Sequence, residues 1–242
     1  MLRSRYIFMK KYSKIGMVIA LKEEFLCFCD KLGKFIGEDR IGSFSFLKYV
    51  LPGGAEVTLV DAGVGEITAA AATQLLITVY GAEIILNCGV VGSLDKAFGL
   101  GELALIDGVV HTDRDTSAID KVEVGRYPEF PDRIIPMDGE CLEYVSGLYP
   151  DVRHAVLGSS DKFIAEKRVK ENLREEFGAN VCDMEGAGIA VIAAKNGIPV
   201  FSVKVVSDNA DESSATIFTT GQVKRAVGAY VDIIFSLLDE IV

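Results

Sequence analysis

The sequence has no excess of positive charge and no long apolar run. Its 242 residues carry 25 Lys and Arg against 35 Asp and Glu, a formal net charge of −10. The basic residues form no stripe of the kind that binds nucleic acid. No run of about 18 apolar residues is present, so no segment is predicted to span a membrane. Neither nucleic acid nor a membrane is therefore an expected partner.

The N-terminal residues 1–14 are basic and lack both helical periodicity and the apolar core of a secretory signal peptide. We expect them to form a tail outside the fold, without a function of its own. The absence of a signal peptide predicts a cytoplasmic protein.

Histidine is scarce, and the cysteines form no metal-binding pattern. Among two histidines and five cysteines, the one close pair is Cys27 and Cys29, and no second pair follows to complete a zinc site. An odd number of cysteines without a secretory signal is typical of free, buried thiols. No metal and no cofactor are predicted, and neither His111 nor His154 is assigned a role.

Hydrophobic residues make up 50% of the chain, enough for one substantial core. Short apolar runs typical of buried strands alternate with helical segments, which is the pattern of an α/β fold. We predict one domain over residues 15–242, a three-layer α/β/α fold around a central mixed, largely parallel twisted sheet. Its strands are expected at 15–20, 44–51, 57–61, 84–87, 103–110, 181–183 and 198–206, and its helices at 22–32, 66–80, 138–148, 166–177, 186–196 and 222–241.

Acids and small residues follow the predicted strands, at the sheet edge where such folds bind ligands. Two carboxyl groups suffice to break a glycosidic bond, one as the acid and one to activate water. The same acids could serve only as helix caps or turn formers, and this alternative stays open for Glu24, Asp208 and Asp211. The segment DAGVG at 61–65 matches no nucleotide-binding loop, so its glycines are better explained by a tight turn.

Five motifs in register carry a resemblance to a known family. They are ALKEEF at 20–25, DAGVG at 61–65, NCGVVG at 87–92, DMEGA at 183–187 and VSDNAD at 206–211. The set resembles the purine nucleoside phosphorylase / nucleosidase superfamily, and most of all the 5′-methylthioadenosine/S-adenosylhomocysteine nucleosidases, over nearly the whole chain. The resemblance implies a nucleoside phosphorylase-like fold, hydrolysis of a purine nucleoside, and a homodimer.

The resemblance also implies catalytic roles for individual residues. Asp208 lies where the family keeps the acid that protonates N7 of the purine, and Ser207 would orient this acid. Glu24 corresponds to the residue that positions and deprotonates the attacking water. Adenine is a poor leaving group as an anion, so proton donation to N7 would supply much of the rate enhancement, typically about 10²–10⁴-fold for such an acid.

Substrate-binding roles follow in the same way. Met184 and Glu185 correspond to the pair that packs on the ribose and binds its hydroxyls. In DKFI at 161–164, Phe163 would stack on the base and the backbone of Ile164 would read its edge, although Phe163 could also be a core residue. TDRDTSA at 112–118 resembles the segment that approaches the neighbouring subunit in a dimer.

Water rather than phosphate is the predicted nucleophile. Sites that hold a phosphate dianion carry cationic and hydroxyl groups, but here the corresponding loops present Glu24, Asn87 and Val90. The runner-up is therefore a phosphorylase, and a futalosine hydrolase would carry the same acids. A catalytically inactive nucleoside-binding protein is the non-enzyme alternative, which the joint presence of Glu24, Glu185 and Asp208 disfavours.

The chain departs from the family pattern at several positions. Val90 stands at a substrate-binding position where the nucleosidases usually keep a serine. A polar contact to the sugar or the water is therefore expected to be missing. Asp183 replaces a glutamate, Gly186 an alanine and Lys204 an arginine. Residues 120–137 match nothing in the family and are expected to border the 5′ side of the nucleoside.

Overall fold

The structure is a computed structural model that describes residues 10–29, 31–214 and 222–242, with side chains in the last segment described from Tyr230 onward. The predicted N-terminal tail falls largely in residues 1–9, outside this range. Tyr12 is buried and its N–H donates to the Ile241 carbonyl, so the chain already packs on the C-terminal helix two residues before the first strand.

The described chain contains both strands and helices along its whole length. The strands are β1 Lys14–Ile19, β2 Lys34–Ile41, β3 Phe44–Val50, β4 Glu56–Asp61, β5 Ile84–Ser93, β6 Leu103–His111, β7 Ile135–Pro136, β8 Arg153–Ser159, β9 Val181–Asp183 and β10 Val200–Asp208. The helices are α1 Lys22–Cys29, α2 Glu66–Thr78, α3 Ser117–Asp120, α4 Gly139–Leu148, α5 Lys167–Phe177, α6 Gly186–Asn196 and α7 Gln222–Ile241.

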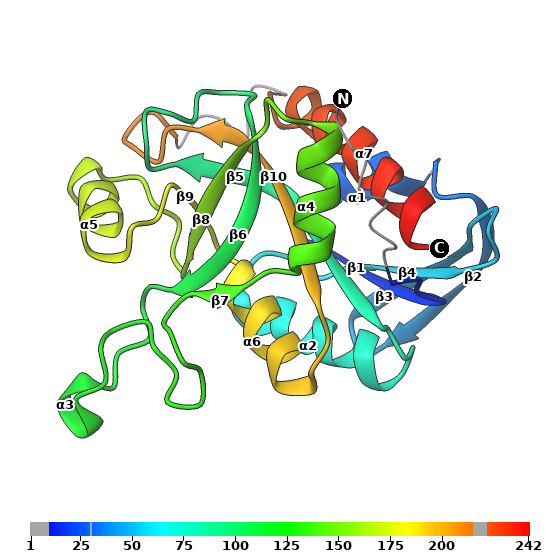
Figure 1. Cartoon of the computed structure of the whole chain (residues 1–242), viewed down its shortest axis with the longest axis horizontal. Helices are drawn as coiled ribbons and strands as arrows, with labels where there is room; N and C mark the ends of the chain where they lie inside the picture. The colour runs from blue at the N-terminus through cyan, green and yellow to red at the C-terminus, as the bar shows by residue number, and fades with distance from the viewer. Residues whose placement is uncertain (1–9, 30, 215–221) are drawn as a thin grey trace, which may run out of the picture.

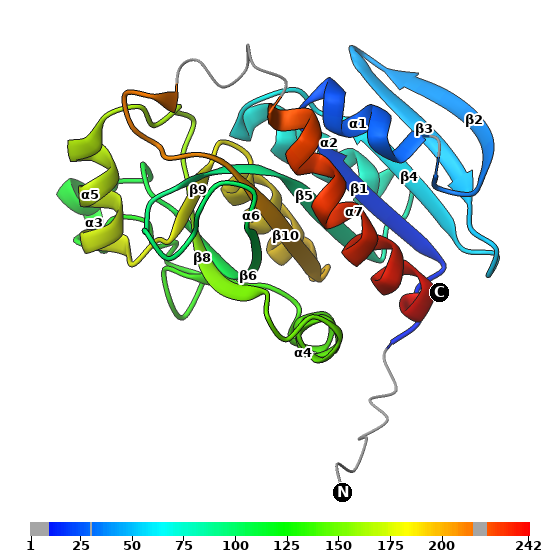
Figure 2. The same ribbon diagram turned by 90° about the horizontal axis from the view of Figure 1, so that it is seen from above.

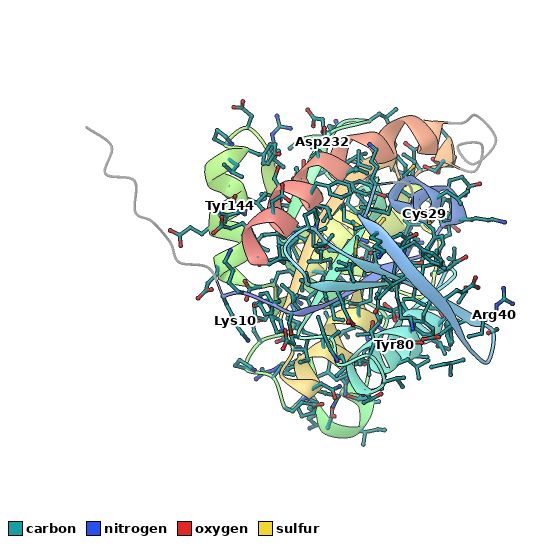
Figure 3. All side chains as sticks on the ribbon, turned by 90° about the vertical axis from the view of Figure 1, so that its right-hand side faces the viewer. Lys10, Cys29, Arg40, Tyr80, Tyr144 and Asp232 are labelled. Atoms are coloured by element: carbon teal, nitrogen blue, oxygen red, sulfur yellow. The ribbon has the colours of Figure 1, made fainter. Side chains whose placement is uncertain are left out.

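The strands form one mixed sheet that closes on itself at one end. From β5 the order β1-β4-β3-β2 extends outward, ending in an antiparallel hairpin whose Arg40 projects away from the body (Figure 3). On the other side of β5, β10 pairs with it in parallel and also pairs antiparallel with β6. Strands β6, β8 and β9 then lead back to β5, because β9 pairs antiparallel with it.

Helices cover both faces of the strands, as predicted. One core joins β1, β5 and β10 to α1, α4 and α7, and a second core packs α2 and α6 against the opposite face. Figure 1 shows α2 and α6 together below the strands, and Figure 2 shows α7 between β10 and β1, where it packs on β10 and β5. None of the described helices is long and apolar enough to cross a bilayer.

The mixed α/β class is confirmed, but the predicted three-layer arrangement does not hold at the β6–β8–β9 end, where the sheet closes into a ring. The antiparallel pairs made by β10 and β9 produce this closure, and they join strands that are far apart in the sequence. The prediction also missed β2, β7, β8 and the short α3, and it ended at residue 87 a strand that continues to Ser93 as β5.

Close packing of α2 and α6 brings the beginnings of both helices to the same place. A Cβ on Gly188 of α6 would lie 2.4 Å from the Glu66 carbonyl oxygen at the start of α2. Only glycine allows this approach, since real Cβ atoms do not come so near backbone oxygen. The two helix N-termini therefore meet at the sheet edge where β4, β9 and β10 end.

Candidate active site

A cavity opens at the carboxyl ends of β1, β5 and β10, with about 720 Å³ of empty space when the solvent at its mouth is included. Its walls come from the start of α1, the second half of β5, residues 162–164, the β9–α6 turn and the end of β10. All the residues that the sequence predicted for the site line this cavity: Glu24, Val90, Phe163, Ile164, Met184, Glu185, Ser207 and Asp208.

Glu24 is held in the cavity wall by backbone groups. Its side chain lies in the first turn of α1 and the residue is 1% exposed. Oε1 accepts a hydrogen bond from the Val90 N–H at 2.8 Å, and Oε2 accepts one from the Leu21 N–H at 3.3 Å. Burial raises the pKa of Glu24 to about 7, although the charge of Lys204 and the two N–H donors act in the opposite direction. Near neutral pH, a carboxyl group with this pKa is partly ionised, and its ionised form can accept a proton.

Val90 contributes through its backbone rather than its side chain. Its N–H fixes Glu24, a contact that any residue at this position could make. The neighbouring Gly89 leaves room for the carboxylate, because a Cβ there would lie 3.2 Å from Glu24 Oε1. The loss of a serine at position 90 therefore leaves the anchoring of Glu24 intact.

Glu185 precedes α6 and is tied to the glycine loop after β4. Its Oε1 accepts a hydrogen bond from the Gly65 N–H at 3.0 Å. Gly65 has φ of 115°, and a Cβ there would lie 2.8 Å from Asp161 Oδ1, so glycine is required at this point. Burial, followed by the charge of Asp183, raises the pKa of Glu185 to about 7. The glycine loop at 61–65 therefore binds a carboxylate of the protein itself, Glu185.

Asp208 ends β10 and is buried with its predicted partner Ser207. The Ser207 hydroxyl lies 2.9 Å from Asp208 Oδ2 and 3.2 Å from the Val91 carbonyl oxygen, and its single proton can be donated to either. Asp208 Oδ1 accepts the Ala210 N–H at 2.8 Å. If Asp208 is protonated on Oδ2, it can donate to the Ser207 oxygen while that hydroxyl donates to Val91.

Asp211 lies outside this arrangement. It caps its own turn by accepting hydrogen bonds from Ser213, which lower the pKa of Asp211. For Asp211, the alternative of a turn-forming acid is therefore the one that the structure supports, whereas Asp208 is buried.

The apolar part of the cavity is formed by Phe163, Ile164 and Met184. Phe163 is 40% exposed, so it stands at the rim and is not a core residue. Ile164 is buried below it. Residues 120–137 do not line this cavity within the described chain, and their place beside the nucleoside stays a prediction.

A buried ion pair beside the cavity was not assigned a role from the sequence. Lys204 Nζ lies 3.0 Å from Asp183 Oδ2 and donates a hydrogen bond to Asn87 Oδ1 at 2.9 Å. Burial alone would lower the pKa of Lys204, but the charges of Asp183 and Glu185 outweigh it and raise that pKa. The signal was present in the sequence, since a lysine inside the apolar run of β10 needs a buried partner.

Comparisons with known proteins identify the family of this chain. A family model described as "Phosphorylase superfamily" matches residues 14–242. The chain belongs to the phosphorylase superfamily. The resemblance inferred from the five motifs is thereby confirmed.

Two similar curated proteins are nucleosidases. The chain is 31% identical over 228 residues to the 5′-methylthioadenosine/S-adenosylhomocysteine nucleosidase of Treponema pallidum, covering 81% of each chain. It is 30% identical over 208 residues to the aminodeoxyfutalosine nucleosidase of Helicobacter pylori, covering 85% of this chain and 89% of the relative.

A solved structure of the superfamily shows the same fold. The Helicobacter pylori 5′-methylthioadenosine/S-adenosylhomocysteine nucleosidase with butyl-thio-DADMe-Immucillin-A superposes with a TM-score of 0.87 at 28% identity, covering 96% of this chain and 99% of that one. The two chains therefore share one fold over nearly their whole length.

Proposed function

We propose that this protein hydrolyses the N-glycosidic bond of a purine nucleoside, with 5′-methylthioadenosine or S-adenosylhomocysteine as the substrate and adenine as the released base. The observation that carries the proposal is the cavity-lining Glu24, a buried carboxyl group held by backbone N–H donors with a pKa of about 7. A group of this kind is suited to take a proton from water at neutral pH.

In the proposed mechanism, Asp208 donates a proton to N7 while Glu24 activates water. Protonation lets the base leave as a neutral molecule, so the bond to the sugar can break with positive charge on the ribose. Ser207 orients Asp208 through the 2.9 Å hydrogen bond. After bond cleavage, the water held at Glu24 attacks the cationic sugar and its proton passes to that carboxylate.

Binding of the nucleoside falls to the remaining cavity residues. Glu185 accepts hydrogen bonds from the ribose hydroxyls, and its negative charge stabilises the cationic transition state. Met184 packs on the ribose, Phe163 stacks on the base at the rim, and the Ile164 backbone reads the edge of the base. Val90 acts by holding Glu24.

The charges of the cavity favour water over phosphate. The positive side chains that line it within the described chain are Lys162, at the exposed rim, and Lys204, which Asp183 already neutralises at 3.0 Å. A phosphate dianion in the interior would face Glu24 and Glu185 without a free cation. Phosphorolysis therefore stays the runner-up.

A futalosine-type nucleoside is a second candidate substrate, because the relatives include an aminodeoxyfutalosine nucleosidase at 30% identity. Both candidate substrates require the same acid and the same activated water. The preferred substrate is therefore identified by comparing kcat/KM for the two nucleosides.

We also propose a cytoplasmic homodimer built from one domain per chain, residues 15–242. Three apolar side chains are exposed: Val64 in the loop before α2, Ile67 on α2, and Ile119 on the arm that carries α3, which extends from the body in Figure 1. The five free cysteines suit a reducing compartment. Light scattering coupled to gel filtration would show twice the 26.1 kDa chain mass for a dimer.

The activity is tested with a panel of nucleosides, in buffer with and without phosphate. Methylthioadenosine, S-adenosylhomocysteine, aminodeoxyfutalosine, adenosine and inosine are each followed by release of the free base. Base release without phosphate supports the hydrolase, and an absolute requirement for phosphate would establish the phosphorylase instead. Ligand-induced stabilisation without any base release would indicate a binding protein.

A further inference from the structure

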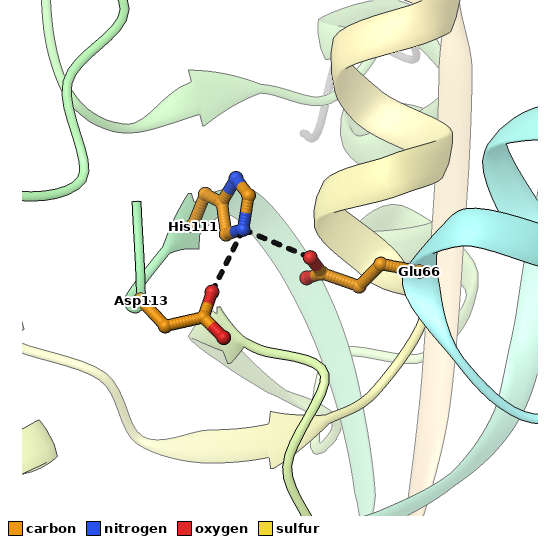
Figure 4. A group of neighbouring side chains, drawn as sticks. All are labelled: Glu66, His111 and Asp113. Carbon is orange, nitrogen blue, oxygen red and sulfur yellow. Dashed lines mark ion pairs between the residues drawn. The ribbon is translucent and has the colours of Figure 1, made fainter. Parts of the chain in front are cut away.

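A second polar cluster lies outside the cavity, where α2 begins and β6 ends. His111 Nε2 is 2.9 Å from Glu66 Oε2 and 2.8 Å from Asp113 Oδ1. The three ligand-type atoms all lie within 4.8 Å of one another. Figure 4 shows both carboxylates directed at the same ring nitrogen, Glu66 from the helix and Asp113 from the segment after the strand.

The three side chains have outer partners that hold them in this orientation. The Ser159 hydroxyl donates to Glu66 Oε1 at 2.9 Å, which leaves Oε2 for the cluster. The Tyr127 hydroxyl lies 2.8 Å from His111 Nδ1, which leaves Nε2 for the cluster. Second partners of this kind fix the tautomer and direction of metal-binding histidines.

We propose that Glu66, His111 and Asp113 form a binding site for one divalent transition-metal ion of the Mn²⁺ or Zn²⁺ type. One imidazole and two carboxylates are a ligand set for such ions. Ligand atoms about 2.0–2.2 Å from an ion in tetrahedral arrangement lie about 3.3–3.6 Å from each other, so the observed separations need only small adjustments. Asp113 has a side chain that is 49% exposed, which gives an ion access from solvent.

The ion would join two parts of the fold that the backbone does not connect directly. Glu66 opens α2 next to Gly65, whereas His111 and Asp113 begin the arm that carries α3. The site is separate from the proposed reaction, because no group of the cluster lines the nucleoside cavity within the described chain. The same distances are compatible with a positively charged imidazole paired to two carboxylates, and the experiment must distinguish the two.

The test measures Mn²⁺ binding to the full-length protein by the electron paramagnetic resonance signal of the free ion. Mn²⁺ prefers oxygen ligands such as carboxylates to thiolates, so the free cysteines do not compete. We expect one ion per chain and a rise in Tm of about 5–10 °C at a hundredfold excess over Kd. His111→Gln and Asp113→Asn should each weaken binding at least about tenfold, and Tyr127→Phe, which removes only the outer partner, about tenfold or more.

The matched control is His154→Gln. His154 is the other histidine and also forms an ion pair, with the single carboxylate of Asp107. Its substitution should leave Mn²⁺ binding unchanged, and Asp113→Asn guards against a folding defect because it alters an exposed side chain. The proposal is overturned if the wild-type protein binds no Mn²⁺ below about 1 mM, if His111→Gln and Asp113→Asn bind as well as the wild type, or if His154→Gln loses binding equally.

Discussion

Lys204 and Asp183 form an ion pair 3.0 Å apart, and neither side chain is more than 3% exposed. Asp183 Oδ1 also accepts the N–H groups of Glu185 and Gly186, so this pair connects β10 to the beginning of α6. Through Glu185, the same pair influences the sugar side of the proposed site. The shorter aspartate and the lysine together replace a longer acid and an arginine, the residues that the family resemblance implies here.

Replacing Lys204 by methionine should destabilise the protein by about 3–5 kcal/mol, because Asp183 is left as an uncompensated buried charge. The free energy of unfolding in urea measures this. The matched control is Lys48→Met, which breaks the more exposed pair with Asp39 at 2.8 Å and should cost no more than about 1 kcal/mol. Equal losses from the two substitutions would contradict the assigned importance of the buried pair.

Asp208→Asn should lower kcat about 10²–10⁴-fold while the fold is kept, because the amide cannot donate a proton to the leaving base. Initial rates of base release and the circular dichroism spectrum are compared with those of the wild type. Asp211→Asn, three residues further along, is the control and should change kcat less than twofold. Activity of Asp208→Asn within tenfold of the wild type would show that another group is the acid.

The activity should rise with pH through about 7, because Glu24 must lose its proton to act as the base. The kcat/KM profile of the wild type is compared with that of Glu24→Gln, which should lose about 10²–10⁴-fold in rate. Glu23→Gln, on the exposed side of the same helix turn, should keep both the rate and the profile. A profile without an inflection between pH 6 and 8 would be evidence against Glu24.

Stability should change with pH in the opposite direction. The pKa of Glu24 rises from 4.5 to about 7 on folding, so the folded state holds the proton more tightly. The stabilisation is fully present below pH 4.5 and is lost as pH rises through about 7. Urea unfolding from pH 5 to 8 should show declining stability in the wild type and a shallower decline in Glu24→Gln. Identical slopes would mean that Glu24 has the same pKa in both states.

Gly65→Ala should weaken nucleoside binding, because the new Cβ would lie 2.8 Å from Asp161 and displace the N–H that holds Glu185. We expect KM to rise about tenfold or more. Gly63→Ala is the matched control in the same loop, since Gly63 also has positive φ but its Cβ would meet nothing within 4 Å. Gly63→Ala should therefore cost stability of about 1 kcal/mol without a change in KM. An equal rise in KM for both would assign the effect to loop strain alone.

Local pattern accounts for most elements of the fold. Strand β9 and helix α6 lie at the predicted residues, because an apolar run followed by an alanine-rich segment leaves few alternatives. Strand β2 was missed because its glycine and charged side chains belong to an exposed edge. Strand β8 was missed because it begins with Arg153 and His154, polar residues that obscure its buried end.

The candidate site divides in the same way. The motifs brought Glu24, Glu185 and Asp208 to attention, and all three line one cavity. The partner of Lys204 could not be inferred, because β9 and β10 do not pair with each other and are brought together only by the ring. The hydrogen bond from Val90 to Glu24 could not be inferred either, because almost any residue can donate a backbone N–H at that position.

Apolar periodicity, glycine positions and the order of the acids along the chain are local properties, and they suffice for the α/β class and for a list of polar residues at strand ends. Other features depend on pairs of elements far apart in sequence. They are the closure of the sheet, the ion pair of Lys204 with Asp183, and the cluster of Glu66, His111 and Asp113. Many strand pairings are compatible with one local pattern, and the choice among them is made by the burial of both faces at once. Tertiary packing therefore decides the pKa values and hydrogen bonds on which the proposed chemistry depends.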